Sequence, residues 1–150
     1  MGYGESVFCA GREALLRWEQ FDLGWVRIAN RRPPIVAGEL VAVEARAALV
    51  WSINFSRITE AVDTSTRFGF LYTTTRIHVE EGQERFVLEY DVASGVVSYL
   101  IEAVSRPRHL LARIAYPFSR AMQHRFARDS HRRMLRSILE GGEPRGVMAE

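Results

Sequence analysis

Three residues in the middle of the chain have side chains suited to acid–base chemistry. His78, Glu81 and Glu84 lie close together in the sequence. A histidine titrates near neutral pH, and a neighbouring carboxylate orients its ring and raises its pKa. His78 and Glu84 are therefore the candidate catalytic residues. The alternative is a polar hairpin loop whose charges are solvated and have no chemical role.

The other nucleophilic and metal-ligating side chains do not form a recognisable site. Cys9 has no activating base near it in the sequence. His124 and His131 can share a helix face, but no carboxylate or thiolate accompanies them as further metal ligands. The chain also has no glycine-rich phosphate loop and no nucleophile elbow. We therefore predict no metal and no cofactor.

Large apolar and aromatic residues recur at alternate positions of the expected strands and along one face of the expected C-terminal helix. Such a set either packs into a solid core or lines an apolar pocket that contains a few hydroxyl groups. Buried tyrosines favour the pocket slightly, because a buried phenol needs a hydrogen-bond partner. The predicted ligand-binding residues are Trp51, Tyr72, Phe86, Tyr90, Tyr99, Phe118 and Met122.

The positive charges are all arginines, and they are concentrated near the C-terminus. From Ser105 to Leu139 there are nine arginines against the single acid Asp129, so this segment carries +8 and the remainder −6. The arginines either pair with the acidic body or bind phosphates, which makes an anionic membrane surface a possible partner. Few aromatic residues lie among them, which argues against nucleic acid as a partner.

The spacing of apolar residues predicts the elements that position these side chains. Helical spacing predicts a short helix over residues 5–18, and a period of two predicts strands from Trp25 to about Ser105. Short turns between the strands imply neighbouring antiparallel pairs. A four-residue period after Pro107 predicts a long helix that Pro117 kinks near Tyr116. The strands are expected at 25–30, 41–51, 57–63, 67–75, 84–91 and 96–104.

Length and composition are those of one globular domain. The chain has 150 residues, of which 47% are hydrophobic and 25% are charged. We expect a single domain over residues 1–150, with a core at about 4–140 and a flexible tail at 141–150. The lone cysteine and the lack of a long apolar run or a signal-peptide pattern predict a soluble cytoplasmic protein without a transmembrane segment.

Several motifs, in order, resemble one family over nearly the whole chain. The motifs are residues 18–25, 67–72, 78–86, 105–107, 116–117 and 123–130. On these motifs the sequence is similar to the uncharacterised family called domain of unknown function nineteen-ninety, and a bacterial source is expected. That family resembles the helix-grip superfamily of START lipid-transfer domains, birch-pollen-allergen-like proteins and polyketide cyclases, which implies a fold but no established reaction.

Together these patterns predict an α+β fold, with an antiparallel sheet of about six strands on a long, proline-kinked C-terminal helix and a short N-terminal helix. The leading functional hypothesis is a protein that binds a small hydrophobic or amphipathic molecule between sheet and helix. One alternative is a polyketide-cyclase-like or lipid-modifying enzyme that uses His78 and Glu84. Another is a module that binds anionic surfaces through the arginine-rich helix. The oligomeric state and the identity of the ligand stay open.

Overall fold

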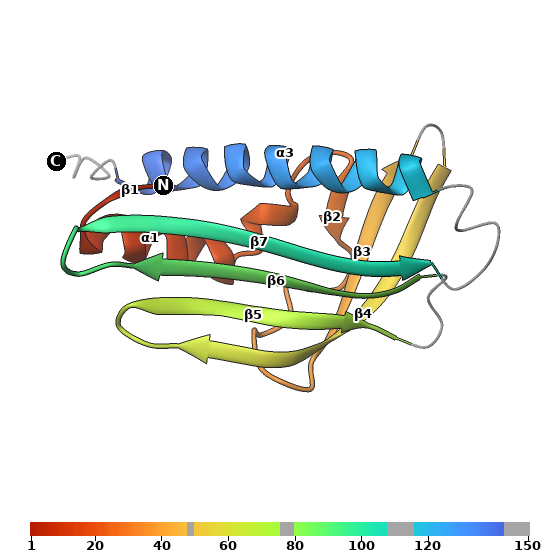
Figure 1. The fold of residues 1–150 in the computed structure, drawn as a ribbon, viewed down its shortest axis with the longest axis horizontal. Coiled ribbons are helices and arrows are strands. Elements are labelled where there is room, and N and C mark those ends of the chain that lie inside the picture. Colours follow the sequence, from red (N-terminus) through yellow and green to blue (C-terminus); the bar gives the residue numbers. More distant parts are fainter. Residues whose placement is uncertain (48–49, 76–79, 108–115, 143–150) are drawn as a thin grey trace, which may run out of the picture.

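Among the residues that the structure describes, a seven-stranded antiparallel sheet forms one layer, and the helices α1 and α3 cover its inner face (Figure 1). The computed structural model describes residues 1–47, 50–75, 80–107 and 116–142. Among these residues, no helix is long and apolar enough to cross a membrane. The elements are β1 (Gly2–Tyr3), α1 (Glu5–Leu16), the 3-10 helix η1 (Glu19–Phe21), β2 (Val26–Ile28), β3 (Leu40–Ala47), β4 (Val50–Asp63), β5 (Arg67–Thr74), β6 (Glu80–Tyr90), β7 (Val96–Pro107) and α3 (Tyr116–Gly142).

The strands follow one another across the sheet in the order β1-β7-β6-β5-β4-β3-β2. From β2 to β7, each strand pairs with the next along the chain, because the connections are too short for crossovers. β1 closes the other edge beside β7, where the amino group of Met1 donates to the carbonyl oxygen of Val97 at 2.9 Å.

Strand alternation separates a buried inner face from a solvated outer face. On β5, Phe68, Phe70 and Tyr72 are buried on the inner face, and their partners on β6 are Leu88, Phe86 and Glu84. Because directly paired residues point to the same side, the register fixes which side chains meet the helices.

An irregularity divides β4 into two parts. The pairing with β5 shifts between Ile58 and Glu60, which leaves Thr59 as an extra residue. Before the shift, β4 runs with β3 and β2 in a part of the sheet that rises steeply from the rest in Figure 1. We call this part the wing: β2, β3 and residues 50–58 of β4. Its inner face buries Val41 and Ile58 against the core.

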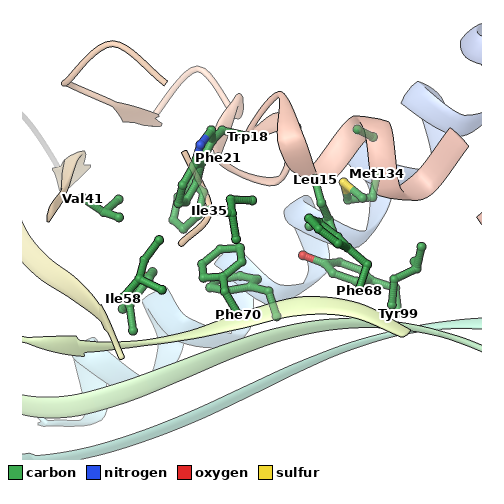
Figure 2. Close-up of a cluster of buried hydrophobic side chains, with 14 of the residues drawn as sticks. Leu15, Trp18, Phe21, Ile35, Val41, Ile58, Phe68, Phe70, Tyr99 and Met134 are labelled. Carbon is green, nitrogen blue, oxygen red and sulfur yellow. The ribbon is translucent and has the colours of Figure 1, made fainter. Parts of the chain in front are cut away.

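The segment after α1 places two aromatic rings in the centre of the core. Trp18, directly before η1, has a left-handed conformation with φ of 59°, and its Nε1 donates to the carbonyl oxygen of Pro33 at 2.8 Å. Phe21 follows in η1 and packs between sheet and helix. Figure 2 shows both rings above Ile58 and Phe70, in the space beneath the helices.

The predicted α+β class, the antiparallel sheet, the N-terminal helix and the long C-terminal helix are confirmed. The strand count is seven instead of about six, because β1 adds two residues at the edge. The single strand expected over residues 41–51 is wrong. β3 ends at Ala47, and Val50 begins the next strand, where Val50 pairs with Ala47 and Trp51 pairs with Arg46. The alternation of apolar residues in the sequence does not change between the two strands, so it gives no sign of this boundary.

The predicted start of the long helix at Pro107 is wrong. Pro107 is the last residue of β7, where it pairs with Glu80, so it does not open a helix. The described α3 begins at Tyr116, which places Pro117 in its first turn. The predicted kink or split near Tyr116 concerns the junction with residues 108–115, which lie outside the described residues, so it stays a prediction. Leu110 and Ile114 of the predicted stripe lie outside the described residues.

Candidate functional site

A tyrosine and a glutamate face each other on the inner side of the sheet. Tyr72 of β5 is paired directly with Glu84 of β6. Tyr72 is buried and Glu84 is partly buried. The Tyr72 hydroxyl donates a hydrogen bond to Oε2 of Glu84. The predicted candidate Glu84 therefore has a phenol as its immediate partner.

Burial changes the protonation of this pair. Burial raises the pKa of Glu84 to about 7, although the hydrogen bond from Tyr72 opposes the rise. Burial and then the charge of Glu84 raise the pKa of Tyr72 well above its usual value, which keeps the phenol protonated. Glu84 can thus donate or accept a proton near neutral pH, as general acid–base groups do.

The side chains of the inner face change in size at the Tyr72–Glu84 pair. On one side lie the rings of Phe70 and Phe86, whose centroids are 5.1 Å apart. On the other side, the inner face carries Thr74 and Gly82, which are joined through Thr74 Oγ1. Ala103, opposite Glu84 on β7, is exposed. We call this end of the inner face the small-residue end.

The centre of the predicted pocket is filled by rings. Phe21 contacts Phe86, Phe126 and Tyr72, with centroid distances of 5.3, 5.2 and 6.4 Å. Phe86 is fully buried. Phe21 is not among the residues predicted for this layer, although the aromatic run from Trp18 to Trp25 is a signal that could have indicated it. Phe86 thus contributes to packing, whatever else it does.

A second polar contact links the sheet to α3. The Tyr99 and Ser130 hydroxyls are 3.2 Å apart, and both residues are buried. Burial raises the pKa of Tyr99, so its hydroxyl remains protonated. His131 Nδ1 and Nε2 lie 2.7 and 3.1 Å from the carbonyl oxygens of Ala127 and Tyr99. His131 therefore connects α3 to β7 through Nε2, whereas Nδ1 faces a carbonyl oxygen of its own helix.

The remaining predicted site residues do not gather at one place. Trp51 lies on the outer face of the wing and is exposed. Tyr90 stacks on Phe8 at the far end of β6, with centroids 6.1 Å apart. Met122 is partly buried on α3. His78 and the side chain of Phe118 lie outside the described residues. The ligand-binding role of the whole set stays a prediction.

One buried amide has no partner in the described structure. Gln20 of η1 is 0% exposed, and neither its Nε2 nor its Oε1 makes a hydrogen bond. Most buried polar groups are satisfied, so such a group usually marks a bound water, a ligand or a functional constraint. Sequence reasoning missed Gln20, and nothing in its local spacing distinguishes it.

The arginines of α3 differ in their surroundings. Arg133 pairs with Glu19, and its Nη2 lies 3.0 Å from Asp22, so it ties α3 to η1. Arg125 lies over the Trp25 ring at 4.4 Å. Arg136, one turn after Arg133, is exposed. Part of the basic helix therefore pairs with the acidic body, and its binding to anionic surfaces stays a prediction. Among the described residues, no cluster of potential metal ligands is found.

A shallow groove of about 230 Å³ lies on the outer face of the sheet, away from the Tyr72–Glu84 pair. Gly69 forms part of its lining. A Cβ atom at this position would lie 2.2 Å from the carbonyl oxygen of Phe86, so β5 and β6 can approach here only because the residue is glycine. Arg85 reaches Glu60 and Glu102 across 3.7 and 3.6 Å. These are long, solvated ion pairs that do not form a fixed binding site.

Comparison with known proteins identifies relatives of undetermined activity. A family model described as a domain of unknown function, DUF1990, matches residues 1–133. A UPF0548 protein of Dictyostelium discoideum is 35% identical over 149 residues, which span 92% of this chain and 69% of the relative. A UPF0548 protein of Arabidopsis thaliana is 28% identical over 145 residues, with the same shares covered. One of Deinococcus radiodurans is 36% identical over 88 residues, 59% of this chain and 44% of the relative.

These matches confirm the family resemblance. No solved structure matches the chain. Membership of the helix-grip superfamily therefore stays a prediction. Because relatives occur in eukaryotes as well as in a bacterium, the likeness does not identify the source of the chain.

Proposed function

The chain belongs to the DUF1990 family, and we propose that it binds a small amphipathic molecule at the small-residue end of the inner face, next to Tyr72 and Glu84. The observation that carries this proposal is the change from packed rings to Thr74, Gly82 and Ala103 beside a half-buried carboxyl group. Apolar pockets recognise ligands through a few fixed polar groups of this kind.

The Tyr72–Glu84 pair would receive the polar group of the ligand. With its pKa near 7, Glu84 either donates to a carbonyl oxygen or accepts from a hydroxyl or amide group. The apolar part of the ligand would lie along the small side chains, because Phe21, Phe86 and Phe126 already fill the centre of the layer. The proposed site is therefore smaller than the pocket that the sequence predicted between the sheet and the C-terminal helix.

A filling substitution tests this binding site. Ala103→Leu places a larger side chain at the small-residue end, while Val104→Leu makes a similar change on the outer face, where Val104 is 63% exposed. Native mass spectrometry of the protein from its own host would show a co-purifying small mass. We expect Ala103→Leu and Glu84→Leu to lose that mass and Val104→Leu to retain it. No bound mass in the wild type, together with no shift of its melting temperature by decanoic acid, decanol or decanamide, would contradict the proposal.

Acid–base catalysis on such a ligand is a second candidate function. The observation that favours it is a carboxyl group whose pKa is raised to about 7 and which is hydrogen-bonded to a phenol. Glu84 would act as the general base or acid, and the Tyr72 hydroxyl would donate to developing negative charge. His78 is the further predicted participant.

A substrate screen distinguishes an enzyme from a binding protein. Thioesters, esters and cyclisable polyketide mimics cover the reactions suggested by the predicted superfamily. An enzyme that uses this pair should lose turnover in Glu84→Gln and His78→Ala, while Glu102→Gln, an exposed carboxylate on the outer face of β7, keeps it. Identical rates in the wild type and both variants would eliminate this second candidate.

A further inference from the structure

The outer face of the wing carries a row of exposed apolar side chains. Trp51, Ile53 and Phe55 occupy three successive outward positions of β4 and are 44%, 53% and 38% exposed. A sheet face that only meets water normally alternates to polar residues at such positions. This row is therefore typical of a surface that contacts an apolar partner.

Apolar exposure continues onto the other face at the end of the wing. Val50 points to the inner side of the sheet, where it is paired with Ala47, and is 70% exposed. Neither the helices nor the body of the sheet covers it. The end of the β3–β4 hairpin thus presents apolar side chains on both faces.

The charged residues beside this row are mainly arginines. Arg46 pairs directly with Trp51, and Arg57 follows Phe55 at the next outward position. The Arg27 guanidinium lies 5.2 Å from the centroid of the Trp51 ring. Among the described residues of the wing, Glu44 is the one carboxylate at an outward position, and Arg27 already pairs with it.

We propose that the wing docks on an anionic lipid surface, independently of the site at Glu84. Tryptophan is favoured at the boundary between headgroups and acyl chains, and arginine keeps its guanidinium at lipid phosphates while its stem covers apolar surface. The end of the hairpin carries apolar side chains on both faces of the sheet, and a lipid layer can contact both faces because it surrounds an inserted segment. A second copy fits less well, because a twofold contact would place the same arginines against one another.

Vesicle sedimentation with matched variants tests this docking. Wild-type protein is mixed with phosphatidylcholine vesicles that either contain or lack phosphatidylglycerol. We expect binding to the anionic vesicles, a loss of about tenfold or more in affinity for Trp51→Ser/Ile53→Ser, and a loss of about fivefold for Arg46→Glu. The matched controls are Leu100→Ser/Val104→Ser on the outer face of β7 and Arg136→Glu on α3, all at exposed positions.

Circular dichroism verifies that each variant folds. If Trp51→Ser/Ile53→Ser does not fold, Arg46→Glu still tests the proposal. The proposal is overturned if the wild type does not bind anionic vesicles at low salt or if it binds neutral vesicles with the same affinity. It is also overturned if Arg136→Glu abolishes binding while the wing variants retain it. A wild-type dimer that Trp51→Ser/Ile53→Ser dissociates, without vesicle binding, would assign the surface to a second copy instead.

Discussion

At the scale of single residues, Glu84 lies where the aromatic rings of the inner face give way to small side chains. Its partner Tyr72 is one of the tyrosines that the sequence pattern placed on this face, and the strand alternation on β5 and β6 suffices to predict that the two side chains point the same way. The pattern does not predict the raised pKa of Glu84, because burial depends on the helices that cover the strand.

The pKa of Glu84 makes stability depend on pH. In the folded protein, the carboxyl group of Glu84 keeps its proton up to about pH 7. In the unfolded chain, the same group has its ordinary pKa of 4.5 and loses the proton at lower pH. The contribution of Glu84 to stability is therefore greatest below pH 4.5 and falls as pH rises from 4.5 to 7, by up to about 3 kcal/mol. Glu84→Gln should reduce this decrease in the free energy of unfolding, which urea denaturation at a series of pH values measures. Glu102→Gln is the control, and an unchanged slope in Glu84→Gln would show that another group causes it.

The unpartnered amide of Gln20 predicts a stabilising substitution. A buried polar group without a hydrogen bond costs about 1–3 kcal/mol, so Gln20→Met, which keeps a similar volume, should raise the free energy of unfolding by about 1 kcal/mol. Chemical denaturation of the two proteins measures this difference. A loss of stability would mean that the amide makes hydrogen bonds, for example to a bound water.

At the scale of elements, Arg133 joins α3 to η1 through Glu19 and Asp22. Glu19 is only 12% exposed, so removal of Arg133 leaves this largely buried carboxylate with the more exposed Arg17 as its remaining cationic partner. We expect Arg133→Met to lower the free energy of unfolding by about 1–3 kcal/mol. Arg136→Met, on the exposed side of the same helix, should stay within about 0.5 kcal/mol. Equal effects of the two substitutions in thermal unfolding would contradict this division of the basic helix.

The elements themselves were largely predictable, and the errors occur where local patterns are ambiguous. Alternation of apolar residues located most strands, but it cannot mark the hairpin between Ala47 and Val50, because the alternation continues through the turn. Pro107 fits both the last position of an edge-exposed strand and the first turn of a helix. Only the pairing of β7 with β6 distinguishes the two cases.

At the scale of the whole molecule, the sequence predicted the two layers but left open whether side chains fill the space between them or line a pocket. The predicted pocket residues Phe86, Tyr72 and Tyr99 do lie beneath the helices. The pattern could not reveal that Phe21, from the segment after α1, enters the same layer and fills its centre. Such a contact joins distant parts of the chain, so it is set by tertiary packing and not by local periodicity.

The protonation of Glu84 tests the proposed binding site most directly, because this site depends on a carboxyl group held partly out of water beside Tyr72. Carbon-detected NMR of the side-chain carboxyl groups would follow Glu84 as pH changes. We predict a midpoint near 7 in the wild type and a higher midpoint in Tyr72→Phe, because the hydrogen bond from the phenol lowers the pKa. A midpoint near 4.5 that Tyr72→Phe leaves unchanged would contradict the account.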